Sequence, residues 1–283
     1  MRWVGPERSP GVDGTGAIRR PLSGDPPTES LDAGPGSGKD RGMVTLEKLS
    51  ARPHDPARMS ELLDTGWPSF ISADRVAERH HPVVRERFGD YELVALDAEG
   101  APLAAGWAVP LVWDSTLEDL PSGYSDSLRR AVEGTVPANT LVVCAAQVHT
   151  DHQGQGLAVT LLTGFRELSE SMGLAHLIVP LRPTLKARYP LTPIADYAAW
   201  TRPDCLPLDP WLRTHVRMGA RVLAPAPRSQ VMTGTVDQWE EWTGLALPSS
   251  GEYVIPQGLA TLQVDREADL GTYVEPNIWV QHR

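Results

Sequence analysis

One strand–loop–helix junction limits what this chain can fold into more than any other feature. Residues 140–149 are almost uninterruptedly apolar, as is typical of a strand covered on both faces. A short loop containing Gly154 follows, and residues 156–172 then carry apolar side chains at the spacing of one helical face. Gly173 stands where a helix commonly ends. A buried strand followed at once by an amphipathic helix predicts an α/β domain.

Strand and helix patterns alternate from residue 43 to residue 228. Strands are predicted at 91–98, 103–113, 140–149, 176–181 and 221–223, and helices at 59–88, 122–133, 156–172 and 209–218. This order predicts one α/β sheet domain over 43–228. Residues 229–283 show a mixed pattern with a short helix at 236–242, and we expect them to form a C-terminal extension packed on that domain.

Residues 1–42 are predicted to be a disordered leader. Glycine, proline and serine dominate this stretch, periodic apolar residues are missing, and its acidic and basic residues balance. Such a composition cannot bury enough apolar surface to offset the entropy of ordering the backbone. A partner-binding tail is the functional alternative, and the strand-like run that opens at Met43 raises a third, that translation begins there.

The composition excludes several classes of protein. The net charge of -10 argues against a protein that binds along nucleic acid or an anionic membrane with its whole surface. Two cysteines far apart, Cys144 and Cys205, exclude a disulfide scaffold and a cysteine-rich zinc site, and no metal ligand set is predicted. No stretch approaches the roughly 18 apolar residues of a membrane helix, and the N-terminus lacks the apolar run of a secretory signal. We therefore expect a cytoplasmic protein.

The loop at the junction has the physical properties of an anion site. The first turn of a helix carries N–H groups without intrahelical partners, and the helix dipole adds positive charge there. A P-loop would need Gly-Lys-Ser/Thr at the helix start, which is absent. A dinucleotide fingerprint would need a small residue at position 159, where this chain has Val159. It would also need an acid at the end of the next strand, but that strand ends Pro180-Leu-Arg-Pro183. Neither of these phosphate-binding patterns fits.

A third pattern does fit. Gln153-x-x-Gly156-x-Ala158, after a strand that ends Val148-His-Thr-Asp-His152, resembles the pyrophosphate loop of the GNAT superfamily of acyl-CoA-dependent N-acyltransferases. The resemblance covers residues 43–228. It implies the GNAT-like fold, a mixed sheet whose central strands splay apart, with acetyl-CoA or another acyl-CoA as cofactor.

The resemblance also implies roles for individual residues. The loop amides of the family hold the CoA pyrophosphate, and the end of the fourth strand pairs with the pantetheine arm. The cofactor-binding residues expected here are Gln147, Val148, His149, Gln153, Gly154, Gln155, Gly156, Leu157 and Ala158. The Val148 amide is the expected oxyanion donor, because acyl transfer passes through a tetrahedral oxyanion that preorganised N–H groups stabilise.

The acid–base residues are less clear from the sequence. Many relatives carry a tyrosine four residues before a glycine, where it protonates the departing thiolate, and His215 occupies that position before Gly219. A histidine could act as the general acid, and an ordinary helix residue is the alternative. Some relatives place a glutamate at the start of the fourth strand, where this chain has Thr140. The base is therefore unassigned, with His149, Asp151 and Asp114 as candidates and ordered water as another route.

The acceptor side is predicted in an arginine- and aromatic-rich segment, residues 182–228. This segment contains eight Lys and Arg residues but only three Asp, although the whole chain is acidic. Arginine and aromatic side chains favour a planar or carboxylate-bearing ligand, and a solvated surface loop is the alternative. The expected substrate-binding residues are Arg182, Tyr189, Tyr197, Trp200 and Arg213.

Three functions compete. The first is an N-acyltransferase, expected to be an acetyltransferase, that acts on an amine of a small molecule. The second is a transferase on the same fold that uses charged tRNA, against which the overall acidity of the chain argues. The third is a non-catalytic acyl-CoA-binding module, suggested by the missing acid on the fourth strand. The aromatic residues of the C-terminal tail, residues 235–283, are compatible with a homodimer.

Overall fold

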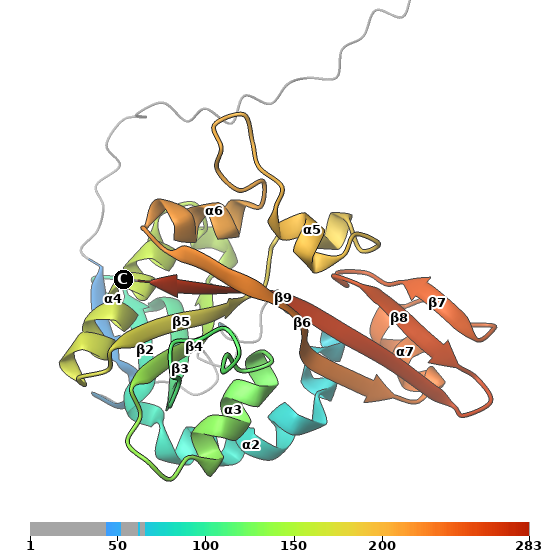
Figure 1. Cartoon of the computed structure of the whole chain (residues 1–283), viewed down its shortest axis with the longest axis horizontal. Coiled ribbons are helices and arrows are strands. Elements are labelled where there is room, and N and C mark those ends of the chain that lie inside the picture. Colours follow the sequence, from blue (N-terminus) through green and yellow to red (C-terminus); the bar gives the residue numbers. More distant parts are fainter. Residues whose placement is uncertain (1–43, 52–61, 63–65, 283) are drawn as a thin grey trace, which may run out of the picture. The chain divides into compact units, whose positions relative to one another are not determined.

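Nine strands form one sheet within the described residues of the computed structural model, 44–51, 62 and 66–282 (Figure 1). They are β1 Thr45–Lys48, β2 Glu92–Leu96, β3 Pro102–Leu111, β4 Thr140–Val148, β5 His176–Leu181, β6 Arg221–Gly234, β7 Gly251–Val254, β8 Thr261–Asp265 and β9 Leu270–His282. The order is β1-β2-β3-β4-β5-β9-β8-β7, with β6 paired to β9. Among these strands β4 and β5 run parallel and the other pairs are antiparallel. The predicted mixed α/β sheet is confirmed, and the leader predicted at 1–42 lies outside the described residues.

Helices cover both faces of this sheet (Figure 1). The described α-helices are α2 Arg75–Arg87, α3 Tyr124–Glu133, α4 Leu157–Ser171, α5 Ile194–Ala198, α6 Pro210–Arg217 and α7 Val236–Thr243. Short 3-10 helices lie at Leu49–Ala51, Ser69–Ala73, Gly89–Tyr91, Thr150–His152 and Lys186–Arg188. Leu161 of α4 packs in one core cluster with Val143, and Leu128 of α3 packs in another with Val142. Successive residues of β4 thus point to opposite faces, which we call the α4 face and the α2–α3 face.

The two central strands separate partway along their length. β4 and β5 pair only through Thr140–Val142 and His176–Ile178. Beyond that point β4 continues along β3, and β5 continues along β9. A bulge on β4 accompanies the separation, because Val143 pairs with Ala108 and Ala145 with Trp107, which leaves Cys144 as the extra residue. The result is a gap in the middle of the sheet, in the position where the sequence predicted splayed strands.

The C-terminal residues take part in the sheet rather than packing outside it. The predicted boundary at residue 228 falls inside β6, and β9 lies beside β5. β6 and β9 form a long ribbon that extends beyond the central strands toward β7, β8 and α7 (Figure 1). A separate core around Trp239, Leu262 and Tyr273 stabilises this end of the sheet.

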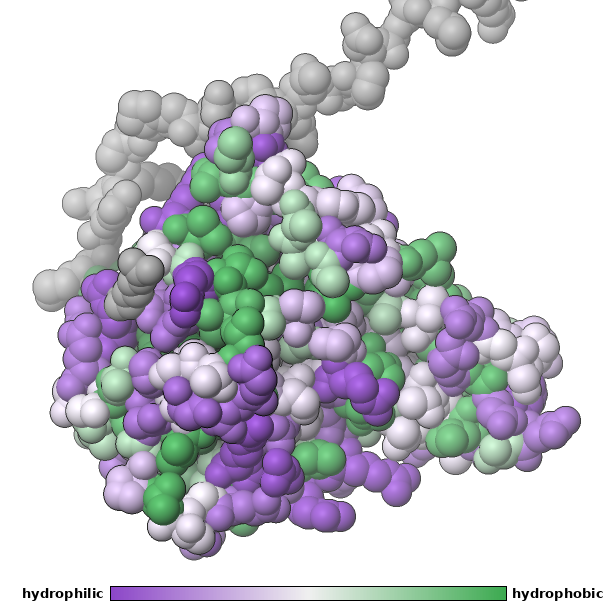
Figure 2. All heavy atoms as spheres, viewed as in Figure 1, coloured by the Kyte–Doolittle hydropathy of each residue, from purple (hydrophilic) through white to green (hydrophobic). Residues whose placement is uncertain are grey.

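On the face shown in Figure 2, hydrophilic side chains cover most of α2 and α3, and a band of hydrophobic side chains lies between them and α6. Within the residues that the structure describes, we find no helix with both the length and the hydropathy that crossing a bilayer requires.

Candidate active site

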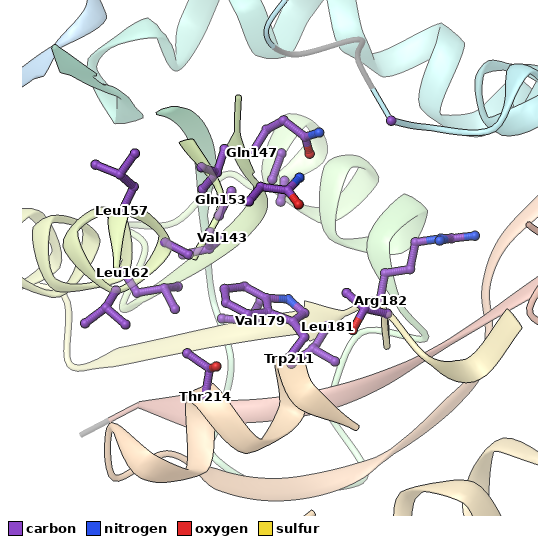
Figure 3. A pocket seen from close by; sticks show the side chains of 18 of the residues that line it. Val143, Gln147, Gln153, Leu157, Leu162, Val179, Leu181, Arg182, Trp211 and Thr214 are labelled. Carbon is purple, nitrogen blue, oxygen red and sulfur yellow. The ribbon is translucent and has the colours of Figure 1, made fainter. Parts of the chain in front are cut away.

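A cavity of about 590 Å³ lies where β4 and β5 separate (Figure 3). Figure 3 shows Gln147 and Gln153 on one side of it, Trp211 and Thr214 of α6 on the other, and Arg182 at the end opposite Leu162. The lining mixes the two faces of the sheet. Val143 and Leu157 belong to the core on the α4 face, whereas Tyr124 and Cys144 pack with the α2–α3 face. Two ligands can therefore approach the gap from opposite sides of the sheet.

The loop before α4 forms a backbone cradle at one end of this cavity. Gly154 and Gly156 adopt φ angles of 76° and 85°, a left-handed conformation that glycine tolerates without strain. A Cβ atom built on either glycine would meet no atom within 4 Å, so the space beside the loop is open. The first N–H groups of α4 lack intrahelical partners and carry the positive end of its dipole. This geometry fits a diphosphate bound to backbone amides.

The structure brings together most of the cofactor-binding residues expected from the sequence. The cavity lining includes Gln147, Val148, Gln153, Gly154, Gly156, Leu157 and Ala158. Gln155 lies within the same loop but is not part of the lining, and His149 instead lines a smaller neighbouring cavity of about 270 Å³.

The end of β4 directs one amide toward the gap. The N–H of His149 donates to the Leu103 carbonyl at 2.9 Å, so it points toward β3. Because consecutive N–H groups of a strand point to opposite sides, the N–H of Val148 points toward the side of β5 and the cavity. Val148 is thus oriented to donate to a ligand in the gap, whereas the N–H of His149 already has its partner within the sheet.

The α2–α3 face of the cavity carries most of its polar side chains. Gln147 of β4, Gln230 of β6 and Asn277 of β9 contribute amides, and Tyr124 contributes a phenol. Among the described lining residues there is no aspartate or glutamate. Arg182, directly after β5, supplies the lining with a permanent positive charge. An anionic group of a ligand would therefore meet a cation and neutral hydrogen-bonding groups on this face.

Arg182 is held in place by three contacts. Its Nε donates a short hydrogen bond to the carboxylate of Glu275, a residue with no exposed surface, and its Nη2 donates to the Gln257 carbonyl at 2.8 Å. The guanidinium also lies 6.0 Å from the ring centroid of Trp67, which lines the cavity too. Glu275 in turn accepts from the Tyr273 hydroxyl. A guanidinium fixed in this way loses little entropy when it binds a carboxylate.

The other expected substrate-binding residues lie outside the cavity lining. Tyr189, Tyr197 and Trp200 pack against one another, with ring centroids 5.0 to 6.1 Å apart. The Tyr197 hydroxyl donates to the carboxylate of Asp209, which caps α6. Arg213 donates to the carbonyls of residues 207 and 208. These side chains hold the segment between β5 and α6 in place.

His215 is placed away from the cavity. It has no exposed surface, and its Nδ1 lies 2.8 Å from Nε2 of His282 at the end of β9. Burial, and then the neighbouring His282, lowers the pKa of His215 to about 3. A neutral imidazole without contact to the cavity is poorly suited to protonate a thiolate. Its neighbours Trp211 and Thr214 line the cavity in its place.

The candidates for the base are also peripheral. Asp151 is exposed beside His149, outside the cavity. Asp114 is bound by the N–H and hydroxyl of Thr116, which lowers the pKa of its carboxyl. Tyr124 does reach the cavity, and its hydroxyl lies 3.0 Å from Nε2 of His81 behind it, but no sequence pattern singles out either residue. These residues stand 43 positions apart on different helices, and no local motif joins them.

No protein-family model matches the sequence. The arginine N-acetyltransferase avaD of Aspergillus versicolor is 33% identical over 276 residues, which cover 84% of this chain and 93% of that protein.

Two solved structures share the fold. The loading GNATL domain of CurA from Lyngbya majuscula has a TM-score of 0.55 at 15% identity, and the GNAT-like decarboxylase GphF, solved with isobutyryl-CoA, has 0.51 at 16%. Each match covers 85% of this chain and 98% of the other. At these identities the two structures show the likeness of the fold alone.

Proposed function

The chain belongs to the GNAT superfamily and is an N-acyltransferase, and we propose that its acceptor is the amine of a small molecule that also carries a carboxylate, such as arginine. The relative from Aspergillus versicolor is named for acetyl transfer to arginine. The observation that carries the proposal is the fixed guanidinium of Arg182 on the α2–α3 face of the cavity.

The α4 face is the side of the donor. Acyl-CoA supplies a thioester carbonyl, which is activated toward attack by an amine. The N–H groups at the start of α4, together with those of Gly154 and Gly156, hold its diphosphate. The N–H of Val148 points into the gap, where it stabilises the oxyanion that develops on the carbonyl oxygen, an effect worth about 3 kcal/mol in comparable sites. These residues position the carbonyl between the two faces of the sheet.

The α2–α3 face is the side of the acceptor. Arg182 binds the carboxylate with charge-assisted hydrogen bonds, which are stronger than neutral ones. Gln230 and Asn277 offer amides to the remaining polar groups of the acceptor. An amine held from this side approaches the carbonyl across the gap between β4 and β5. In this proposal the enzyme acts on a free small molecule and needs no charged tRNA, which distinguishes it from the second function considered above.

A panel of acceptors tests the proposal. Release of free thiol from acetyl-CoA is followed with arginine, with arginine methyl ester and with agmatine, which is arginine without its carboxylate. A second series contains neutral α-amino acids and their amides. We expect turnover of carboxylate-bearing amines and a loss of about 10- to 100-fold in kcat/KM when the carboxylate is removed. Equal turnover of arginine and agmatine would contradict the role of Arg182, and mass spectrometry of the product identifies the acylated nitrogen.

A further inference from the structure

A phenol and an imidazole form a hydrogen-bonded pair at the acceptor side of the cavity. Tyr124 is the first residue of α3 and lines the cavity beside Cys144. Its hydroxyl oxygen lies 3.0 Å from Nε2 of His81 on α2. Both residues lie on the α2–α3 face, opposite the loop that receives the diphosphate. The pair is therefore on the side from which the amine approaches.

The surrounding structure fixes both rings. Trp107 of β3 packs edge-on against each of them, with centroid distances of 5.8 Å to His81 and 6.0 Å to Tyr124. The N–H of Tyr124 donates to the hydroxyl of Ser229 at 2.9 Å. Cβ of an alanine at Gly123 would lie 2.2 Å from the backbone of Ser229, so the turn before α3 is pressed against β6. A pair that is held from α2, β3 and β6 keeps its geometry without help from a ligand.

Other acid–base groups are scarce on this side. The described lining residues include no carboxylate, and the guanidinium of Arg182 offers only hydrogen-bond donors. Burial raises the pKa of the Cys144 thiol, so the thiol stays neutral. His152 also lines the cavity but belongs to the 3-10 helix that precedes the diphosphate loop. Tyr124 with His81 is thus the pair best placed to accept a proton from an incoming amine.

The charges around the pair set its protonation state. Burial, followed by Arg85 and His80, lowers the pKa of His81, and Asp74 opposes them. Burial, with Cys144 and Asp74, raises the pKa of Tyr124 well above its ordinary value. At neutral pH the imidazole is therefore neutral and the phenol protonated. In the tautomer with its proton on Nδ1, Nε2 accepts from the phenol, whose oxygen keeps lone pairs for another donor.

We infer that Tyr124 and His81 form a proton relay that deprotonates the attacking amine. The inference rests on the proposed function of the same cavity. As the amine nitrogen bonds to the thioester carbon, one N–H proton passes to the Tyr124 oxygen, and the phenolic proton passes to Nε2 of His81. The C–S bond then breaks, and the thiolate takes a proton from water while His81 returns its proton to solvent. The products are an amide and free CoA.

Variants of the pair test the relay. Tyr124→Phe keeps the ring and its packing on Trp107, and we expect kcat to fall by about 100-fold or more. The dissociation constant of CoA, measured by titration calorimetry, should not change. Tyr253→Phe is the matched control, because its hydroxyl bonds to Ser249 far along the sheet. Full activity of Tyr124→Phe, with Tyr253→Phe also active, would overturn the relay.

The role of His81 needs a measurement that a merely structural residue would not move. His81→Gln keeps a hydrogen-bond acceptor for the phenol but takes up no proton. In the wild-type enzyme, protonation of the acceptor amine should make log kcat/KM fall with decreasing pH at a slope of about 1. Below the pKa of His81, protonation of the imidazole should steepen this slope toward about 2. The variant should keep the shallower slope throughout. An unchanged pH profile in His81→Gln would contradict the inference.

A readout without an acceptor separates this inference from the proposed function. The pKa of His81, followed by NMR of its ring protons, should change in Tyr124→Phe, because the phenol no longer donates to Nε2. An unchanged titration would show that the hydrogen bond does not form in solution and would overturn the relay. If the titration changes but no carboxylate-bearing amine is turned over, the proposed acceptor class is wrong, whereas the hydrogen bond between Tyr124 and His81 is confirmed.

Discussion

His215 and His282 share a buried hydrogen bond, with 2.8 Å between Nδ1 of the first and Nε2 of the second. The bond joins α6 to the last strand of the sheet. Burial lowers the pKa of both side chains, to about 3 for His215 and about 4 for His282. His215 keeps its Nε2 without a hydrogen-bond partner among the described residues. The fold therefore accommodates this pair in its neutral form.

The neutral pair makes stability depend on pH. Above pH 6.5, the ordinary pKa, the histidines are neutral in both the folded and the unfolded chain, so they cause no dependence. Below it the unfolded chain takes up protons that the fold cannot, and stability should fall by about 1.4 kcal/mol per pH unit for each histidine. The loss should continue to about pH 4 for His282 and to about pH 3 for His215. Urea unfolding between pH 7 and 4 measures it, and a double variant His215→Asn/His282→Gln should show a shallower fall.

A substitution in the same pair distinguishes a catalytic role of His215 from a packing role. If His215 protonates the leaving thiolate, as the sequence suggests, His215→Asn should lower kcat strongly. Its burial away from the cavity favours packing, so we expect kcat of this variant to stay within about threefold of the wild type. Steady-state kinetics at pH 7.5, where both proteins are folded, makes the comparison. A loss of two orders of magnitude in kcat would restore His215 to the mechanism.

Arg182 and Glu275 should couple stability to acceptor binding. Arg182→Met leaves the carboxylate of Glu275 buried without its cation, which typically costs about 3–5 kcal/mol. In Arg182→Met/Glu275→Gln the buried charge is gone, so most of that loss should be recovered. Both variants lack the guanidinium and should show an acceptor KM raised by about 10- to 100-fold. If the double variant regained stability and had the acceptor KM of the wild type, Arg182 would have no role in acceptor binding.

The two cysteines should react at very different rates. Cys205 is exposed, whereas Cys144 is partly buried in the cavity wall and burial raises the pKa of its thiol. Because the thiolate is the reactive form, a maleimide at pH 7 should label Cys205 first. CoA should slow the labelling of Cys144 further and leave that of Cys205 unchanged. Peptide mapping by mass spectrometry checks both statements.

The parts of the site that were predictable from the sequence are local ones. The strand, loop and helix from Thr140 to Ser171 are contiguous, so periodicity and glycine placement indicated them directly. The predicted helix at 156–172 and α4 at Leu157–Ser171 differ by one residue at each end. The diphosphate cradle depends only on backbone within this stretch, and the chemistry of a helix N-terminus could be inferred without a tertiary structure.

The acceptor side depends on contacts between distant segments. β9 lies beside β5, and Glu275 of β9 holds Arg182, which precedes it by 93 positions. The composition of residues 182–228 did not reveal which aromatics pack together and which face a ligand. Tyr189 and Trp200 pack together, while Trp67 and Tyr124, from outside that segment, reach the cavity. The cytoplasmic location and the homodimer stay predictions of the sequence.

The diphosphate cradle can be tested by substitution. Gly156→Glu places a side chain and a negative charge at a position with φ of 85° beside the first amides of α4. CoA affinity should fall by about 100-fold or more, because the carboxylate competes for those amides. Gly156→Ala is the matched control, since it adds only backbone strain of about 1–2 kcal/mol. Equal affinities of the glutamate and alanine variants would show that charge at this position does not matter.

A crystal structure with CoA tests the central claim most directly. It should show the diphosphate on the N–H groups of residues 154–158 and the pantetheine arm in the gap between β4 and β5. The thiol should lie near the point where the gap reaches the α2–α3 face, within reach of Tyr124. Coenzyme bound elsewhere, or a gap filled by side chains in the complex, would contradict the account.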